Sequence, residues 1–248
     1  MSFLRFCWRA IWLIVWLVLG LFSVSCLFPF MRGSSRQWMI KHYSRVLLWL
    51  CGVKVRVVGK PVIAQPVLWA ANHISWLDIF ILNHVRATCF VAKSDIRHWP
   101  ILGWLVAGAG TVFIDRNQRH AIRGVIEQMH ERFAQGGAVG FFPESTTSDG
   151  LSVRPFHTSL FEAAISATLS VQPVALRFYQ HNERTVRFAF VGEQSLVANV
   201  WTLLSQRGVS VECEFLQPIT ADECIAMGRT DCAALAYQRV KHAVEQAA

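Results

Sequence analysis

A histidine and an aspartate stand five positions apart in the segment NHISWLD, where His73 and Asp78 follow the apolar run VLWAA. An imidazole beside a carboxylate can take a proton from a hydroxyl, because the carboxylate fixes the imidazole tautomer and stabilises the imidazolium that forms. If the attacking group is the substrate's own hydroxyl, no serine or cysteine nucleophile is needed. His73 is therefore the candidate general base, and Asp78 is its candidate orienting partner.

The spacing of His73 and Asp78 limits where the two residues can lie. Five residues apart on one helix, their side chains would point about 140° away from each other, since each residue turns the helix by about 100°. They can meet only if His73 lies in a loop and Asp78 lies in the first turn of the next helix. A second interpretation makes Ser75 the N-cap of that helix, with Asp78 completing a capping-box pattern. Both interpretations share one geometry, so the pattern leaves them open.

The sequence lacks the signatures of several other catalytic sites. It contains no GxSxG nucleophile elbow, no P-loop, no GxGxxG and no HExxH. Its seven cysteines form no CxxC pair. An odd number without such spacing argues against a disulfide scaffold or a zinc site and favours a reducing compartment. We therefore expect neither a metal nor a cofactor.

Short β-rich segments alternate with helical ones after residue 52, and these elements must position the candidate base. The pattern predicts strands over 53–58, 67–71, 89–92, 111–114, 138–142, 171–176, 185–191 and 209–216. It predicts helices over 76–84, 118–134, 157–168, 195–206 and 229–245. Such alternation is typical of an α/β domain with a largely parallel sheet flanked by helices, here residues 53–248.

Basic and apolar residues dominate the N-terminal segment. No acidic residue precedes Asp78, whereas nine basic ones do: Arg5, Arg9, Arg32, Arg36, Lys41, Arg45, Lys54, Arg56 and Lys60. They flank the apolar run 11–31 and recur in an amphipathic stretch over 35–51, which favours anionic lipid headgroups over nucleic acid as the partner. With 53% hydrophobic and 16% charged residues, the chain is typical of a folded domain that contacts lipid. We predict a membrane-associated helical hairpin over residues 1–52.

The apolar run 11–31 has three interpretations. A single helix could span the bilayer, because about 20 apolar residues match the thickness of its hydrocarbon core. A helix that enters one leaflet and returns at Pro29 would keep both basic flanks on the cytoplasmic side. The third is a cleaved signal peptide with its site near Cys26, against which the basic segment after Cys26 and the unpaired cysteines argue.

Three further segments follow NHISWLD along the chain: VFIDR over 112–116, FPESTTS over 142–148 and VQPVAL over 171–176. In this order the four segments resemble the blocks of the 1-acylglycerol-3-phosphate acyltransferases, a glycerolipid acyltransferase family. The family's blocks are NHxxxxD, a strand ending in an Ile-Asp/Arg-Arg turn, FPEGTRS and a short strand containing proline. The basic helical N-terminus is also similar. The resemblance therefore covers nearly the whole chain and implies the family's α/β fold with an N-terminal membrane anchor.

The resemblance implies an enzyme of the cytoplasmic membrane whose catalytic domain faces the cytoplasm. It would transfer a fatty acyl group from acyl-CoA or acyl-carrier protein to the sn-2 hydroxyl of lysophosphatidic acid, making phosphatidic acid without a cofactor. By this resemblance His73 is the general base and Asp78 orients it. The residues implied to bind substrate are Arg116 at the acceptor headgroup and, around it, Lys93, Glu144, Ser145, Thr146 and Thr147.

Two departures from the family pattern bear on the acceptor. Thr147 occupies the position of the arginine in FPEGTRS, and His157 lies where a later Pro-Phe-Lys-x-Gly pattern has lysine. A threonine hydroxyl cannot replace a charge-assisted, bidentate contact to phosphate, although Arg154 could supply one from the same loop. One alternative is therefore acylation of another lysolipid, such as the zwitterionic lyso-ornithine lipid. The other is a non-catalytic lipid-binding protein in which His73 and Asp78 are only cap residues.

Overall fold

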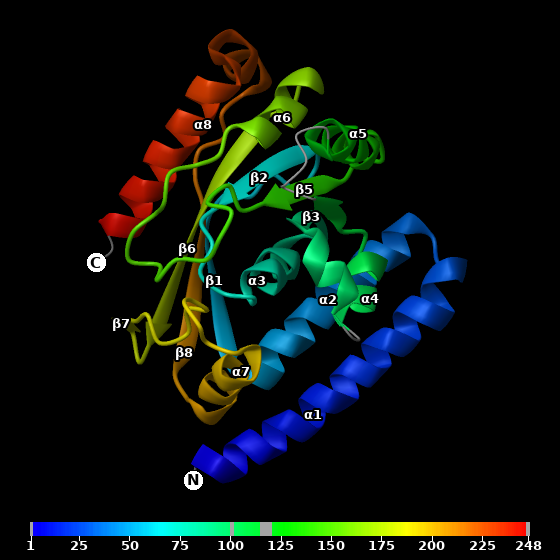
Figure 1. The fold of residues 1–248 in the computed structure, drawn as a ribbon, viewed down its shortest axis with the longest axis vertical. Helices are drawn as coiled ribbons and strands as arrows, with labels where there is room; N and C mark the ends of the chain where they lie inside the picture. Colours follow the sequence, from blue (N-terminus) through cyan, green and yellow to red (C-terminus); the bar gives the residue numbers. More distant parts are fainter. Residues whose placement is uncertain (1, 100–101, 115–120, 247–248) are drawn as a thin grey trace.

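The computed structural model describes residues 2–99, 102–114 and 121–246. Within these residues eight strands form one sheet in the order β1-β8-β6-β2-β5-β3-β4, with β7 paired to β6. The strands are β1 (Val53–Gly59), β2 (Val67–Ala71), β3 (Thr88–Lys93), β4 (Val112–Ile114), β5 (Ala138–Phe141), β6 (Val171–Gln180), β7 (Glu183–Arg184) and β8 (Val209–Phe215). Figure 1 shows helices on both faces of the sheet. The predicted α/β fold is therefore confirmed.

Most neighbouring strands run parallel. β2 pairs in parallel with β5 and β6, β3 with β4 and β5, and β1 with β8, whereas β6 pairs antiparallel with β7 and β8. All residues of the central strand β2, with sequence VLWAA, are buried. A parallel strand covered on both faces needs such a continuous apolar sequence. Because β2 ends at Ala71, this central strand places His73 at the carboxyl edge of the sheet.

The helices form two layers. They are α1 (Ser2–Phe22), α2 (Gly33–Cys51), α3 (Asp78–Val85), α4 (Leu102–Gly108), α5 (Ala121–Ala134), α6 (Glu162–Ser166), α7 (Leu196–Ser205) and α8 (Ala221–Glu245). Side chains alternate between the two faces of a strand. Trp69 and Ala71 therefore pack with α1, α2, α3 and α7, whereas Leu68 and Ala70 pack with α5, α6 and α8.

The two N-terminal helices form a hairpin. α1 continues through the irregular turns Ser23–Leu27 and Phe28–Phe30, and the chain returns as α2. The Trp16 ring stacks on Tyr43 with 4.0 Å between centroids, and its indole donates to the Tyr43 carbonyl at 3.1 Å. Trp16 also belongs to the core cluster that contains Trp69 of the central strand. The hairpin and the sheet thus share one hydrophobic core.

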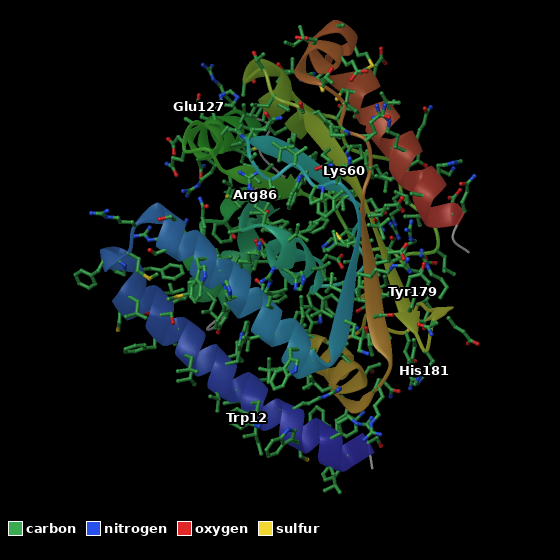
Figure 2. The ribbon with its side chains drawn as sticks, turned by 180° about the vertical axis from the view of Figure 1, so that it is seen from behind. Trp12, Lys60, Arg86, Glu127, Tyr179 and His181 are labelled. Atoms are coloured by element: carbon green, nitrogen blue, oxygen red, sulfur yellow. The ribbon has the colours of Figure 1, made fainter. Side chains whose placement is uncertain are left out.

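α1 is held against the rest of the protein at both of its ends. Arg5 and Arg9 donate to three backbone carbonyls at the C-terminal end of α7, at distances of 2.6 to 3.1 Å. Beyond the other end of α1, Val24 lies so close to Gly108 of α4 that a Cβ on Gly108 would come within 2.2 Å of a Val24 methyl. The segment Ser2–Phe30 is long and apolar enough to cross a membrane. Figures 1 and 2 show α1 along the outer edge of the protein.

The prediction of a strand over 185–191 is wrong. After the short strand β7 the chain follows an irregular path, because the backbone of Phe190 bonds to loops beside His73 and not to the sheet. The other strand predictions correspond to β1–β6 and β8 within a few residues. Residues 118–120 of the predicted helix 118–134 lie outside the described residues, and α5 forms the rest.

One helical prediction needs correction, and some helical segments were not predicted. The predicted helix 157–168 is limited to the short turn Ser159–Phe161 and α6, because the residues before it pair with the loop after β5. The predicted helix 229–245 corresponds to the second part of α8, which follows the non-helical backbone of Gly228 (φ 72°); the first part, which begins after the capping box of Thr220 and Glu223, was not predicted. The short helices over Ser94–His98 and α4 were not predicted; both are too short for a clear helical period.

Candidate active site

His73 and Asp78 meet at the carboxyl end of β2. Nδ1 of His73 lies 2.8 Å from Oδ2 of Asp78. His73 lies in the loop and Asp78 is the first residue of α3, as their spacing requires. Because a carboxylate only accepts hydrogen bonds, Nδ1 carries the proton and Nε2 presents its lone pair. The His73 side chain is 21% exposed whereas that of Asp78 is fully buried, so a substrate can reach the imidazole but not the carboxylate.

Asp78 also shapes the loop that carries His73. Its Oδ2 atom accepts the backbone N–H groups of Ile74 at 2.6 Å and Ser75 at 2.9 Å. This bond to Ser75 is one half of the predicted capping box. The other half is absent, because the Ser75 hydroxyl accepts the N–H of Leu77 at 3.4 Å and Leu77 is the N-cap of α3. One carboxylate therefore both supports the loop and orients the imidazole.

The backbone of His73 is fixed by the loop that follows β5. Its N–H donates to Oε1 of Glu144 at 2.7 Å, and its carbonyl accepts the N–H of Ser148 at 2.8 Å. The imidazole stacks on the Phe142 ring, with centroids 4.0 Å apart and an interplanar angle of 12°. β2 and β5 are parallel neighbours, so their carboxyl ends bring NHISWLD and FPESTTS together.

Glu144 joins two loops from a buried position, with only 3% of the residue exposed. Besides the N–H of His73 it accepts the backbone N–H of Arg154, through Oε2 at 2.8 Å. Burial raises the pKa of the Glu144 carboxyl group, against the lowering effect of these hydrogen bonds. Both carboxylate oxygens are thus engaged by the backbone, and what Glu144 does in this structure is hold the two loops together.

Asn72 anchors the start of the His73 loop to the neighbouring strand β6, a role that was not predicted from the sequence. Its buried side chain donates to the Leu176 carbonyl at 3.0 Å and accepts the Leu176 N–H at 2.7 Å. These bonds continue the pairing of β2 with β6 beyond Ala71, where the main chain turns away toward His73. An asparagine directly after a strand was the available signal, because its side chain can replace backbone hydrogen bonds.

The segment after β7 holds the catalytic loop from a third side. The Phe190 N–H donates to the Ile74 carbonyl at 2.8 Å, and the Phe190 carbonyl accepts the Thr147 hydroxyl. On α7, Oδ1 of the buried Asn199 accepts the indole N–H of Trp76 at 2.9 Å. The contacts of Asn199 with Trp76 and of Phe190 with Ile74 span more than a hundred residues and leave no pattern in the sequence, so neither residue was predicted.

The loop 145–154 contains four of the predicted substrate-binding residues. Ser145 adopts a left-handed backbone with φ of 63°, at the position where the family block FPEGTRS has glycine. Thr146 and the side chain of Arg154 are exposed. Thr147 is half-buried and its hydroxyl donates within the protein. Of these residues, Thr146 and Arg154 present their side chains to solvent.

Two of the predicted substrate-binding residues, Lys93 and Arg116, remain. Lys93, the last residue of β3, is exposed and forms an ion pair with Asp95. Arg116 lies outside the described residues. Among the residues that the structure describes, no group of three or more His, Cys, Asp or Glu side chains could hold a metal ion.

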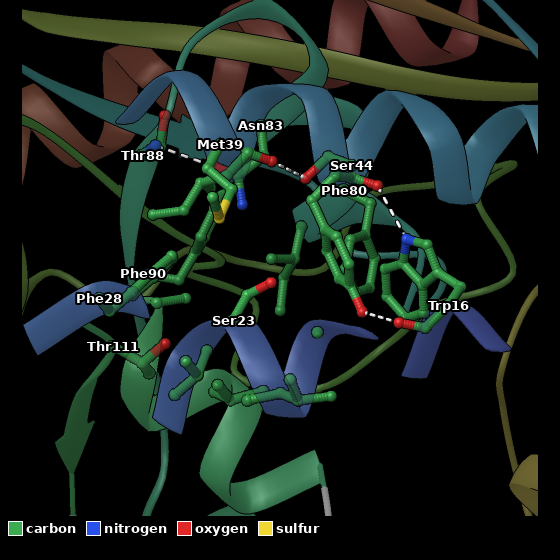
Figure 3. Close-up of a pocket in the computed structure, with 18 residues that line it drawn as sticks. Trp16, Ser23, Phe28, Met39, Ser44, Phe80, Asn83, Thr88, Phe90 and Thr111 are labelled. Atoms are coloured by element: carbon green, nitrogen blue, oxygen red, sulfur yellow. Dashed lines mark hydrogen bonds between the residues drawn. The ribbon is translucent and has the colours of Figure 1, made fainter. Parts of the chain in front are cut away.

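An apolar cavity lies between the hairpin and the sheet (Figure 3). It is lined by residues of α1, α2, α3, α4 and β3. Several of its polar groups are engaged locally: the hydroxyls of Ser23 and Ser44 donate to backbone carbonyls four residues earlier, and Asn83 accepts the backbone N–H of Thr88. Most of the other lining side chains are apolar, so the cavity suits a hydrocarbon chain better than a polar ligand.

Aromatic rings connect this cavity to the catalytic pair. Phe90 lines the cavity and stacks on Phe142, with centroids 5.8 Å apart and planes 9° from parallel. Phe142 in turn stacks on His73. Ile79 and Phe80, which follow Asp78 in α3, also line the cavity. The cavity wall is therefore built from residues adjacent to the catalytic pair.

Comparison with known proteins identifies relatives of the chain. The family model described as Acyltransferase matches residues 54–177. The chain is 41% identical over 162 residues to the 1-acyl-sn-glycerol-3-phosphate acyltransferase of Neisseria gonorrhoeae. This alignment covers 64% of this chain and 63% of the Neisseria protein, so the chain matches less than two thirds of that relative's length. It is 34% identical over 242 residues to the lyso-ornithine lipid O-acyltransferase of Rhizobium meliloti strain 1021, which covers 92% of this chain and 82% of that protein.

The fold has a counterpart among solved structures. The 1-acyl-sn-glycerophosphate acyltransferase PlsC from Thermotoga maritima superposes with a TM-score of 0.73, covering 99% of this chain and 95% of that chain at 21% identity. The resemblance of the four sequence blocks is confirmed by the family model, whose match includes all of them. The chain belongs to the acyltransferase family, as shown by the family match and by the Rhizobium meliloti relative, whose alignment covers 92% of this chain.

Proposed function

We propose that the chain is a lysolipid O-acyltransferase that works at a membrane surface. The observation that carries the proposal is the His73–Asp78 pair, in which Nδ1 is held by a buried carboxylate and Nε2 stays available to a hydroxyl. The relatives named above acylate lysolipids by their names, and the block that contains this pair lies within the family match. A base without a neighbouring protein nucleophile suits direct attack by the substrate's hydroxyl.

The transfer follows from the orientation of the imidazole. Nε2 of His73 takes the proton of the acceptor hydroxyl as its oxygen attacks the thioester carbonyl carbon of acyl-CoA or acyl-carrier protein. Asp78 stabilises the imidazolium that forms. When the tetrahedral intermediate collapses, the C–S bond breaks and the imidazolium returns the proton to the leaving thiolate. The products are the acylated lipid and the free thiol, and the base is regenerated.

The apolar cavity is the site that we propose for the acyl chain. Phe90 lines the cavity and stacks on Phe142, which stacks on His73, so the thioester end of a chain bound there would pass beside these two rings to reach Nε2. A hydrocarbon chain gains about 0.8 kcal/mol for each methylene that it removes from water, which rewards a long apolar site. The cavity is closed on one side by Trp16 and Gly20 of α1, so the hairpin takes part in substrate binding.

The exposed face of α1 is the proposed contact with the membrane. It carries the large apolar residues Phe3, Leu4, Trp8, Ile11, Trp12, Ile14, Val15, Val18, Leu19 and Phe22. Because α1 is tied to α7 at one end and its extension packs on α4 at the other, we favour a helix lying in one leaflet over one that spans the bilayer. The catalytic domain would then lie on the cytoplasmic side, where acyl-CoA and acyl-carrier protein occur.

Lysophosphatidic acid is the first acceptor that we propose. The family resemblance assigns its phosphate to Arg116, and Arg154 offers an exposed guanidinium from the loop tied to Glu144. Lyso-ornithine lipid is the second candidate. The observation that favours it is Thr147, which supplies no charge where the family block has arginine and whose hydroxyl is engaged by Phe190.

Acyl transfer from labelled acyl-CoA, with both acceptors offered in parallel, tests the proposed function. Wild type should form product, His73→Ala should form none above background, and His242→Ala should match wild type, because His242 is exposed on α8. If His73→Ala retains full transfer, the base assignment is wrong and another group must take the proton of the acceptor hydroxyl. If wild type forms no product from acyl-CoA or from acyl-carrier protein with any lysolipid, the proposed function fails.

Substitution of Thr147 tests the choice of acceptor. Thr147→Arg adds the charge of the family block but also breaks the bond to Phe190, so Thr147→Val, which breaks that bond alone, is the matched control. Relative to Thr147→Val, the arginine should raise transfer to lysophosphatidic acid and lower transfer to lyso-ornithine lipid. The opposite change would argue against phosphate recognition at this position.

A further inference from the structure

α7 exposes apolar side chains beyond those of the hairpin. Its sequence LVANVWTLLS contains no charged residue. Val197 is 78% exposed and Trp201, one helical turn later, is 41% exposed. Large apolar residues exposed one turn apart on a helix form a stripe that a soluble surface rarely leaves uncovered. This stripe needs a partner.

The exposed stripe of α7 continues the exposed face of α1. The Trp201 ring lies 4.2 Å from the Phe6 ring and 6.3 Å from the Phe3 ring, measured between centroids. Phe3 and its neighbour Leu4 are themselves exposed. Figure 1 shows α7 beside the N-terminal end of α1, at the lower edge of the molecule. The two helices thus form one apolar surface.

The charges around this surface are mostly basic. Arg5 and Arg9 of α1 bond to carbonyls at the C-terminal end of α7, and Arg207 is exposed just after it. Glu193, before the helix, is the acidic residue on its flank. An apolar stripe beside arginines matches the boundary between acyl chains and anionic headgroups. Tryptophan is also the residue type enriched at that depth.

We propose that α7 is a second membrane-contacting element, so that the protein docks on a lipid bilayer through α1 and α7 together. This inference rests on the membrane location within the proposed function. Val197 and Asn199 are about 200° apart around the helix, and Asn199 holds Trp76 of the catalytic loop. One face of α7 therefore meets the lipid while the other supports the loop that carries His73, which keeps the catalytic loop close to the bilayer.

Flotation of the full chain with vesicles of phosphatidylcholine and phosphatidylglycerol tests the docking. Val197→Glu should weaken the partition constant about tenfold, because it removes apolar contact and adds a charge that anionic lipid repels. The matched control is Ile225→Glu, a 50% exposed position on α8, the helix that packs against the opposite face of the sheet from α1; this variant should bind as wild type does. Equal binding by wild type and both variants would overturn the proposal.

A variant expected to bind vesicles more tightly excludes misfolding as the cause of weaker binding by Val197→Glu. Val197→Trp should bind the same vesicles more tightly than wild type, which a damaged fold would not do; weaker or unchanged binding would count against the proposal. Acyl transfer to a short-chain lysolipid dissolved as monomers should be unchanged in Val197→Glu. If wild type transfers no acyl group but the vesicle results hold, the proposed function fails and the docking surface stands. If transfer is normal but Val197→Glu binds vesicles fully, the docking surface fails alone.

Discussion

Replacing Asp78 by asparagine separates the charge of this side chain from its hydrogen bonds. Oδ2 of Asp78 accepts from Nδ1 of His73 and from the N–H groups of Ile74 and Ser75. Since three donors converge there, the asparagine must place its oxygen at that position and its NH2 group at the position of Oδ1. Nδ1 then keeps its proton and its acceptor while the negative charge is lost, and the NH2 group is buried where Oδ1 has no hydrogen-bond partner.

The size of the effect follows from the imidazolium that forms in the reaction. Two charges about 4 Å apart attract by about 4 kcal/mol at an effective dielectric constant of about 20. The neutral amide oxygen retains about 1 kcal/mol of this as an ordinary hydrogen bond. The loss of about 3 kcal/mol in the transition state lowers kcat about 150-fold. This is less than the roughly 10⁴-fold loss seen when the same substitution gives a catalytic triad the wrong tautomer.

Steady-state transfer from labelled acyl-CoA by Asp78→Asn measures this loss, with thermal unfolding as the control for structure. The asparagine keeps all three bonds to the loop, but its NH2 group takes the place of Oδ1, a buried atom with no hydrogen-bond partner, so its Tm should fall, though less than that of Asp78→Ala. Asp78→Ala leaves the buried N–H groups of Ile74 and Ser75 without acceptors and should unfold at a clearly lower temperature. A kcat of Asp78→Asn within about threefold of wild type would refute the electrostatic role and leave Asp78 as a cap residue.

Three further predictions concern the residues around the pair. Asn199→Leu leaves the Trp76 indole without its acceptor, so kcat should fall about tenfold at unchanged donor KM. Trp76→Phe should lower kcat by the same factor. If the losses in the double variant were additive, the two side chains would not act through their hydrogen bond. Ser145→Gly relieves a left-handed backbone that costs about 1–2 kcal/mol, of which glycine's entropy offsets about 0.5–1, so Tm should rise by about 2 °C; a fall would show that the serine side chain matters more. Burial raises the pKa of Glu144 above 4.5, so the folded state binds its proton more tightly than the unfolded state. Wild type should therefore lose stability relative to Glu144→Gln as the pH rises through that raised pKa, and urea unfolding of both proteins at about pH 4.5 and about pH 7 checks the sign.

The geometry of the catalytic pair could be predicted from sequence because it is local. Helix geometry alone requires His73 in a loop and Asp78 in the first helical turn, and the structure has both. The apolar sequence of β2 likewise predicts a strand buried on both faces. These predictions depend only on residues within a few positions of each other, which sequence patterns record well.

The contacts that hold the loops around His73 and Asp78 could not be predicted, because they join residues that are distant in sequence. The alternation over 185–191 suggests a strand, yet the backbone of Phe190 bonds to Ile74 and Thr147 on two other loops. Asn199 reaches Trp76 across 123 positions. Thr147 was identified as a departure from the family block, but only the structure shows that its hydroxyl is engaged. The role of Arg116 stays a prediction, since it lies outside the described residues.

The bonds between α1 and α7 bear on the order in which the protein can be made. Arg5 and the carbonyl that it binds are 200 positions apart. β1 likewise cannot pair until β8 has been synthesised, since Val53 pairs with Val209. At about 5–20 residues per second, a ribosome needs about 10–40 s to cover that interval. During synthesis α1 can pack on α2 as soon as Tyr43 has emerged, but α7 does not yet exist, and the apolar surface that α1 exposes is open to aggregation. We expect the bilayer to cover the apolar face of α1 during this interval. The membrane would then protect the growing chain from aggregation before α7 has been synthesised.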